Sequence, residues 1–195
     1  MKPRLYVVDD FFTDPEYIRS EVLQKEHTDL TSPIDNITYH GINMGVPHHI
    51  NVAMRIALRR LFGKEIKVKY CFSRLRTSRM KPTPNNIHSD RTMSQYAAHI
   101  YLSEVWPDGS GTSFWKNKQY DMEEDVGLTE EQAETIRAQT NDRSYWTLTN
   151  RVAGKYNRFI VHDSTLFHSA DPFEGFGDNI NDGRLVVTMF FDLEE

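Results

Sequence analysis

The stretch Ile66-Lys-Val-Lys-Tyr-Cys-Phe-Ser73 decides the expected fold class. Apolar or aromatic residues occupy its even positions, from Ile66 to Phe72, and polar or small residues occupy the odd ones. This period of two is that of a half-buried strand, because successive side chains of a strand point to opposite faces. Similar short runs continue almost to the C-terminus, so the sequence predicts a mainly β domain.

The strand-like runs are short and are separated by turn signals such as Pro107-Asp108-Gly109. Many short strands that follow helices are typical of a sandwich or barrel with helices packed outside. No repeat, low-complexity tract or linker divides the chain, and we expect one domain over residues 1–195. Besides the run at 66–73, we expect strands at residues 5–8, 87–90, 96–102, 112–115, 158–162, 165–169 and 185–192.

Two helices are expected before residue 66. Asp14 is a good N-cap and Pro15 suits the first helical position, so the first helix should run to about Glu26. Apolar residues at helical spacing predict a second helix over residues 50–62, and Gly63 provides a natural C-terminal stop.

Residues 116–154 interrupt the series of strands. Thr129-Glu-Glu-Gln132 is a capping box and should open a short helix that ends near Gln139. Insertions at the mouth of a barrel often form lids over active sites, and this is one interpretation of the segment. The alternative is that Trp146 packs into an outer core.

Composition limits the function classes. The chain has 195 residues, of which 38% are hydrophobic and 12% aromatic, which suits one globular core. The net charge of −5 gives no general support to nucleic-acid or anionic-membrane binding. The N-terminal Met-Lys-Pro-Arg lacks the apolar core of a signal peptide, and no apolar run approaches the roughly 20 residues of a membrane span. We therefore expect a cytoplasmic protein.

Two local features modify this picture. A basic cluster contains Arg74, Arg76, Arg79 and Lys81, and it is either a solvated loop or a positive rim that attracts an acidic substrate. Cys71 is the single cysteine, so the chain forms no internal disulfide and no cysteine-rich zinc site. Its place in a strand-like run favours a buried, inert thiol.

The tripeptide His88-Ser-Asp90 is the strongest metal-binding signal. Such a tripeptide arises readily by chance, and His27-Thr-Asp29 matches it too. We place His27 at the end of the first helix, where residues i and i+2 point about 200° apart. His88 and Asp90 are expected in an extended segment, where both side chains face one side and can chelate one ion.

A third ligand must come from another strand. His168 closes the apolar run Thr165-Leu-Phe-His168, and we expect it to be the last residue of a core strand at the barrel mouth. A histidine satisfied by hydrogen bonds is the alternative. Two histidines and one carboxylate on one face of a metal leave positions open, as in non-haem Fe(II) oxygenases.

An ordered series of segments now resembles a known superfamily. The segments are Asn86–Asp90, Ala98–Ser103, Gly109–Phe114, Asn157–His168 and Gly183–Thr188. In this order they resemble the 2-oxoglutarate- and Fe(II)-dependent oxygenases, nearest to the prolyl-4-hydroxylase-like branch. The resemblance covers residues 66–192, and the opening strand and helix match as well. It implies a double-stranded β-helix, which is a distorted jelly roll, with packed N-terminal helices.

The resemblance also implies roles for five residues. His88, Asp90 and His168 match the iron ligands, and Arg184 matches the basic residue that pairs with the far carboxylate of 2-oxoglutarate. Tyr101 matches a tyrosine that hydrogen-bonds the same carboxylate. The cofactor would be Fe(II), with 2-oxoglutarate and O₂ as co-substrates and succinate and CO₂ as products. For Arg184, a surface arginine that opens a strand is the alternative.

Three positions depart from the superfamily pattern. Arg184 follows His168 by sixteen positions, so the intervening residues 173–182 would have to loop out and return. Val186 replaces a serine that often follows the arginine. Phe190 replaces a second arginine that the nucleobase-demethylating branch needs, which argues against nucleic acid as a partner. The presence of Asp90 argues against halogenation.

We therefore expect a hydroxylase that acts on a C–H bond of a protein side chain, a peptide or a small metabolite, with no membrane partner. Two alternatives stay open: a jelly-roll metalloenzyme that does not use 2-oxoglutarate, and a jelly-roll binding protein with structural histidines. His99 has the same strand parity as Tyr101 and should point inward with it. His162-Asp163 is a rival metal pair, although adjacent strand residues face opposite sides.

Overall fold

The computed structural model describes residues 4–33, 36–81 and 86–194. Within these residues it contains two antiparallel sheets and three α-helices. The larger sheet has the order β1 (Leu5–Val8), β8 (Arg158–Asp163), β5 (Tyr96–Tyr101), β10 (Arg184–Leu193), β4 (Ile66–Arg76), β3 (Thr38–Asn43) and β2 (Thr28–Thr31). The smaller sheet has the order β7 (Trp146–Ala153), β6 (Gly111–Asn117) and β9 (His168–Asp171). The helices are α1 (Pro15–Leu23), α2 (His48–Phe62) and α3 (Glu130–Gln139).

The two sheets face one another and enclose an interior. Side chains from both sheets meet there in one buried cluster, to which Tyr101 and Val186 contribute from the larger sheet and Phe114 and Val152 from the smaller. This arrangement confirms the expected mainly β class with packed helices, and it is the jelly roll of a double-stranded β-helix.

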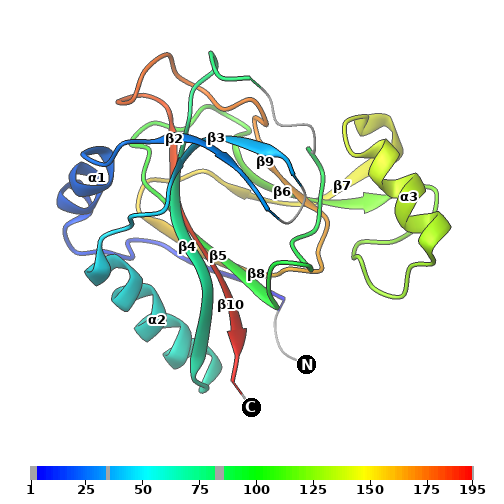
Figure 1. Ribbon diagram of the computed structural model, residues 1–195, viewed down its shortest axis with the longest axis horizontal. Helices are drawn as coiled ribbons and strands as arrows, with labels where there is room; N and C mark the ends of the chain where they lie inside the picture. Colours follow the sequence, from blue (N-terminus) through cyan, green and yellow to red (C-terminus); the bar gives the residue numbers. More distant parts are fainter. Residues whose placement is uncertain (1–3, 34–35, 82–85, 195) are drawn as a thin grey trace.

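Helices α1 and α2 cover the outer face of the larger sheet (Figure 1). The side chains of Ile50, Met54 and Leu58 lie one turn apart on one face of α2 and are fully buried there. The helix ends at Phe62, and Gly63 provides the predicted C-terminal stop in the left-handed conformation, at φ 63°. No helix in the described part of the chain is long and apolar enough to span a membrane.

A β-bulge in β4 overturns the expectation of a single apolar face along 66–73. On β10, the consecutive residues Phe190 and Phe191 pair with Tyr70 and Val68, so Lys69 is an extra residue in the ladder. Beyond the bulge the faces exchange, because the side-chain period of a strand is two. Tyr70 is consequently 39% exposed instead of packing against the helices.

The bulge decides what the end of β4 presents to the interior. After it, Cys71 and Leu75 pack toward the helices. The even-numbered residues Arg74 and Arg76 therefore face the space between the sheets. The solvated-loop interpretation of the basic cluster is thus wrong for these two arginines, which belong to a strand.

Several predicted boundaries were wrong. Helix α1 ends at Leu23, three residues before the expected Glu26. His27 therefore precedes strand β2 and does not lie at the end of a helix. His168 begins β9, although it was expected to end a strand. Residues 87–90 contain a single β-bridge, at His88, in place of a strand.

Within segment 116–154, helix α3 packs on the outer side of the smaller sheet, and β7 is one of the strands of that sheet. Ile136 of α3 and the ring of Trp146 join a buried cluster with Trp115 and Phe167. The indole nitrogen of Trp146 donates to the carbonyl of Gln139. Figure 1 shows α3 on the side of the molecule away from α1 and α2. The Thr129 capping box forms as predicted.

Candidate metal centre

The three predicted ligands converge in the structure. One ligand atom each from His88, Asp90 and His168 lies within 4.8 Å of the other two. The His88 Nε2 atom is 3.6 Å from Asp90 Oδ1, and the His168 Nε2 atom is 3.2 Å from Asp90 Oδ2. No other group of this kind exists among the residues that the structure describes.

The backbone holds the three residues in place. His88 and His168 exchange hydrogen bonds, with the N–H of His88 donating at 3.0 Å and the N–H of His168 at 2.8 Å. Residues paired in this way in an antiparallel ladder carry their side chains on the same face. The N–H of Asp90 donates to the carbonyl of Ser164 at 2.8 Å, which anchors the second ligand of the chelating pair.

Hydrogen bonds also select the imidazole tautomers. The Nδ1 atom of His88 lies 3.0 Å from the carbonyl oxygen of Asn86, and that of His168 lies 2.9 Å from the carbonyl oxygen of Leu166. A carbonyl only accepts, so each Nδ1 carries a proton and Nε2 is the nitrogen of each ring that is available to a metal. Metal-binding histidines are commonly oriented by such partners.

The charges of the site suit a cation. Burial would raise the pKa of Asp90, but His168 and His88 together hold that pKa well below its usual range. Burial lowers the pKa of His88, and the neighbouring His168 lowers it further. The structure thus brings together an ionised carboxylate and two imidazoles, which is the donor set of a facial triad.

Arg184 and Tyr101 lie on the same interior face. Tyr101 pairs with Val186, so Arg184 is its diagonal neighbour on β10. Arg184 is buried, its Nε atom has no hydrogen-bond partner, and no acidic side chain of the described residues pairs with it. The surface-arginine interpretation is therefore wrong. Burial lowers the pKa of Arg184, while the hydroxyl of Tyr101 partly offsets this effect.

The surroundings of this pair were not predicted from the sequence. The Tyr101 hydroxyl lies 2.6 Å from Thr112 Oγ1. The ring of Trp106 packs 4.6 Å from that of Tyr101 and lies 5.8 Å from the Arg184 guanidinium. Gly154 permits this packing, because a Cβ atom there would lie 2.0 Å from the Trp106 ring. The Trp106 ring thus lies against both the tyrosine and the guanidinium.

The long spacing between His168 and Arg184 is accommodated by a loop. The side chain of Asp182 accepts from the backbone N–H groups of Asp178 and Asn179, which closes the loop on itself. The N–H of Ser78 donates to the carbonyl of Gly177 and ties the loop to the end of β4. The insertion loops out and returns as expected.

Two further histidines lie behind the ligands. The ring of His162 is 4.4 Å from that of His168, and its Nε2 atom is 3.2 Å from the Nε2 atom of His99. The Nδ1 atom of His99 lies 2.9 Å from Thr188 Oγ1. Burial and the charge of His168 lower the pKa of His162 to about 3, so this histidine is neutral. Both expectations for these residues are confirmed: His99 points inward, and His162 is not part of the chelating group.

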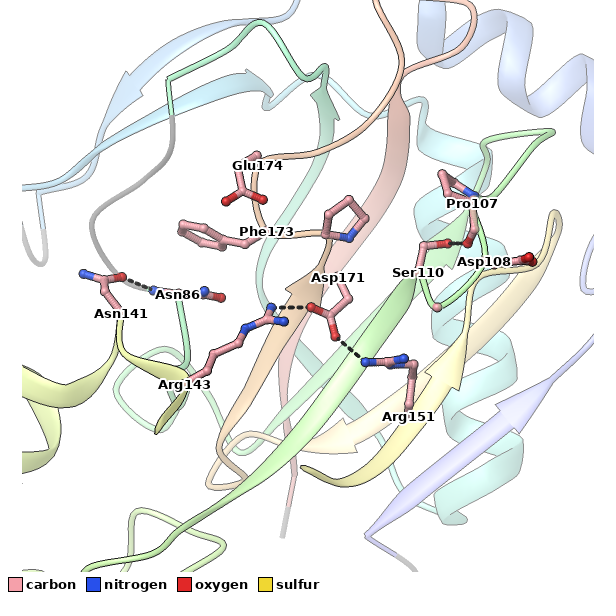
Figure 2. Close-up of a pocket in the computed structure, with 12 residues that line it drawn as sticks. Asn86, Pro107, Asp108, Ser110, Asn141, Arg143, Arg151, Asp171, Phe173 and Glu174 are labelled. Atoms are coloured by element: carbon pink, nitrogen blue, oxygen red, sulfur yellow. Dashed lines mark hydrogen bonds and ion pairs between the residues drawn. The ribbon is translucent and has the colours of Figure 1, made fainter. Parts of the chain in front are cut away.

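A polar pocket of about 490 Å³ is lined by residues of β7 and β9 and of neighbouring loops (Figure 2). Asp171, three residues after His168, lies at its centre between the guanidinium groups of Arg143 and Arg151. Asn86, whose carbonyl holds His88, lines the pocket too. Both arginines of the pocket are paired with a carboxylate, unlike Arg184.

The fold and the site define a class: jelly-roll proteins with a His-Asp-His triad in the interior and a buried arginine nearby. Residues 1–191 match the model of a family described as "Family of unknown function (DUF6445)", and the chain belongs to this family. No curated protein matches the sequence.

Solved structures share the fold at low sequence identity. HygX from Streptomyces hygroscopicus, solved with nickel and 2-oxoglutarate, is 13% identical with a TM-score of 0.59, and the match covers 97% of this chain and 83% of HygX. EctD from S. alaskensis, solved with 2-oxoglutarate and 5-hydroxyectoine, is 15% identical with a TM-score of 0.58 and coverages of 98% and 73%. The epimerase SnoN, solved with Fe³⁺, alpha ketoglutarate and nogalamycin RO, is 13% identical with a TM-score of 0.61 and coverages of 97% and 79%. These similarities establish the jelly-roll fold.

Proposed function

We propose that this chain is an Fe(II)- and 2-oxoglutarate-dependent oxygenase whose iron is held by His88, Asp90 and His168. One observation carries the proposal: two imidazole Nε2 atoms and an ionised carboxylate converge in the same interior as the unpaired guanidinium of Arg184. The solved structures with this fold and these bound groups support it.

The residues present fit both groups. Two neutral imidazoles and one carboxylate suit Fe(II) and leave coordination positions open. A buried arginine without an acidic partner is costly, and a carboxylate from a co-substrate would compensate it. When bound, iron and 2-oxoglutarate supply the oxidation of a C–H bond by O₂, with release of succinate and CO₂.

The side chains of the protein would bind and orient 2-oxoglutarate. The planar guanidinium of Arg184 can donate two parallel hydrogen bonds to a carboxylate and stays protonated when buried. The Tyr101 hydroxyl, held by Thr112, provides a neighbouring donor. Trp106 excludes water from both, which strengthens their electrostatic interactions. Together these side chains would fix the far end of 2-oxoglutarate while the triad holds its other end through the metal.

The reaction we infer is hydroxylation of a small molecule. The titles of the similar structures name small molecules, namely 5-hydroxyectoine, hygromycin B and nogalamycin RO. SnoN is an epimerase, so the fold also supports another outcome, and product analysis must separate the two. The prolyl-4-hydroxylase-like branch, the cytoplasmic location, the single-domain organisation and a lid role for residues 116–154 stay predictions.

Anaerobic titration of the Mn(II)-loaded protein with 2-oxoglutarate tests the proposal directly. We expect wild type and Arg79→Gln to bind, and Arg184→Gln to lose about 10-fold or more in affinity, as expected when a charge-assisted hydrogen bond is removed. Arg79 is a matched control because it is exposed and belongs to the same basic cluster. Wild-type protein that binds metal but no 2-oxoglutarate would contradict the proposal.

Mass spectrometry of the product then distinguishes hydroxylation from epimerisation. With Fe(II), 2-oxoglutarate and O₂, hydroxylation adds one oxygen atom to the substrate, whereas epimerisation leaves its mass unchanged. Succinate release without a change in either mass or configuration of any added compound would count against a hydroxylase.

A further inference from the structure

A second interior arginine also lacks an anion. The Nη2 atom of Arg74 is sealed from solvent and has no hydrogen-bond partner. Its Nε atom makes one long contact, 3.4 Å, with the carbonyl oxygen of His40. Its guanidinium lies 5.5 Å from the centre of the Tyr39 ring. No carboxylate of the described residues forms an ion pair with Arg74, although this residue is partly buried.

The neighbouring basic residues are accounted for. Arg76 donates through Nη2 to the carbonyl oxygens of Lys81 and Glu174, each at 3.2 Å, and so holds the loop before β10. Arg79 is 73% exposed and pairs with Asp178 at 3.4 Å. Arg76 also has a sealed nitrogen without a partner, its Nε atom, but its two bonds to carbonyls give it a structural task, whereas no contact of Arg74 gives it one.

Arg74 faces the space where the proposed reaction takes place. It pairs with Val186 of β10, which pairs in turn with Tyr101 of β5, so the three residues form one row across the interior face of the sheet. Arg184 occupies the diagonal position, about 7–8 Å away along neighbouring strands. The charge of Arg74 also acts on His88, whose side chain is the most exposed of the three ligands at 38%.

The electrostatics call for an external anion. Burial lowers the pKa of Arg74 to about 9, and the like charges of Arg76 and Arg184 contribute. The group is still protonated at neutral pH, so a positive charge stands beside other positive charges without a counter-ion. An isolated buried charge is unfavourable unless it is paired. The positive charges on this face thus exceed the one carboxylate that 2-oxoglutarate would bring to Arg184, which leaves Arg74 available to a second anion.

We propose that Arg74 binds an oxyanion of the substrate, so that the proposed oxygenase acts on small molecules that carry a carboxylate or a phosphate group. This inference rests on the proposed function and deepens it. Arg184 would bind the co-substrate and Arg74 the substrate, on adjacent strands beside the same metal centre. The exposed side of His88 marks where that substrate would approach the triad.

The first experiment separates the two arginines. Mn(II)-loaded protein is titrated anaerobically with 2-oxoglutarate as wild type, Arg74→Gln, Arg184→Gln and Arg79→Gln. We expect Arg74→Gln to bind within about threefold of wild type, well short of the 10-fold change expected when a charge-assisted hydrogen bond is lost. An equal loss in Arg74→Gln and Arg184→Gln would overturn the inference, because both arginines would then bind the co-substrate.

The second experiment tests the anion itself. The melting temperature of the protein loaded with Mn(II) and 2-oxoglutarate is measured with acetate, inorganic phosphate and sodium chloride at one ionic strength. A ligand that binds only the native state raises this temperature. We expect acetate or phosphate to raise it in wild type and Arg79→Gln, but not in Arg74→Gln, with a smaller rise in Arg74→Lys, which keeps the charge. The same shift in all four proteins, or no shift in any, would overturn the inference.

The third experiment identifies the source of the anion. Succinate release is measured with carboxylic acids and their amides, and with phosphate monoesters and their parent alcohols. We expect the charged member of a pair to stimulate turnover, and Arg74→Gln to lower kcat/KM for it by about 10- to 100-fold. An amide or alcohol as effective as its charged partner would overturn the inference. Failure of the wild type to bind 2-oxoglutarate would instead overturn the proposed function, while the acetate and phosphate measurement on Mn(II)-loaded protein would still test Arg74.

Discussion

The backbones of His88 and His168 form a two-way hydrogen-bonded pair although eighty positions separate them in the sequence. Their imidazole rings lie 4.6 Å apart, each with Nδ1 directed to a carbonyl of its own segment. The geometry of the site is therefore set by main-chain pairing, and the side chains need little rearrangement to accept a metal.

Metal binding should depend on the triad and should stabilise the fold. We expect Asp90→Ala and His168→Ala to lose stoichiometric Fe(II) or Mn(II) binding, since each removes one of three ligands. In wild type, metal at 100 times its dissociation constant should add about 2.7 kcal/mol to the free energy of unfolding. Anaerobic calorimetry and thermal unfolding measure both effects.

The second His-x-Asp tripeptide provides the control for that prediction. Asp29 is exposed and contacts His40, and His27 contacts Ser73, so neither faces the other. Asp29→Ala should leave metal binding unchanged. Equal loss of metal in Asp29→Ala and Asp90→Ala would show that the assigned centre is wrong.

Removal of the Tyr101 hydroxyl should weaken 2-oxoglutarate binding less than removal of the Arg184 charge. Tyr101→Phe deletes one neutral donor, and we expect about a 2- to 10-fold rise in the dissociation constant. The exposed Tyr145 offers a control, Tyr145→Phe, which should bind like wild type. An unchanged affinity in Tyr101→Phe would remove this residue from the binding site.

Gly41 should be intolerant of any side chain. It has φ 70°, and a Cβ atom there would lie 1.8 Å from the carbonyl oxygen of Leu75, which belongs to the β4 backbone. Gly63 also has a positive φ, but nothing lies within 4 Å of its Cβ position. We expect Gly63→Ala to cost about 1 kcal/mol of unfolding free energy through backbone strain alone.

Gly41→Ala adds the steric clash to the same strain and should cost clearly more than Gly63→Ala. Urea denaturation of both variants at 25 °C measures the difference. Equal midpoints for the two variants would show that β3 and β4 do not approach as closely as described.

Cys71 should behave as an unreactive thiol. Burial raises its pKa to about 11, and a hydrogen bond with Asn51 offsets only part of this effect. Since the thiolate is the nucleophile, the protonated form that dominates below pH 11 reacts slowly. Iodoacetamide at pH 8 should modify the native protein much more slowly than the urea-unfolded chain, as mass spectrometry can follow. Similar rates in both states would contradict the assignment.

The convergence of His88 and Asp90 could be predicted because their signal is local. The pair His88 and Asp90 needs only an extended backbone to share a face, and Gly63 and Thr129 mark helix ends through their own conformational preferences. His27 and Asp29 do not form a chelating pair, as predicted, but the predicted reason was wrong, since His27 precedes a strand and is not in a helix. Its separate hydrogen bond to Ser73, and not helix geometry, keeps it from chelating.

Features that depend on partners in space could not be predicted. Strand β7 is largely exposed, with Leu148 itself 43% accessible, so it shows no apolar alternation. The bulge at Lys69 exists only in relation to the register of β10. The interior position of Arg74 follows from that bulge, and its lack of an anionic partner could be recognised only once its neighbours were known.

The extra residue in β4 has a consequence for how the chain can change. Ahead of Lys69 the strand contributes to the helix-facing layer with its even-numbered residues, and beyond it with its odd-numbered ones. Deleting Lys69 itself would remove the bulge and leave Val68, Tyr70 and Cys71 in regular alternation opposite Phe191, Phe190 and Met189, so that Arg74 would keep its interior face. The bulge is therefore the position at which this strand can lose one residue and keep both faces, whereas a single deletion at Phe72 or Ser73 would turn Arg74 toward the apolar helices.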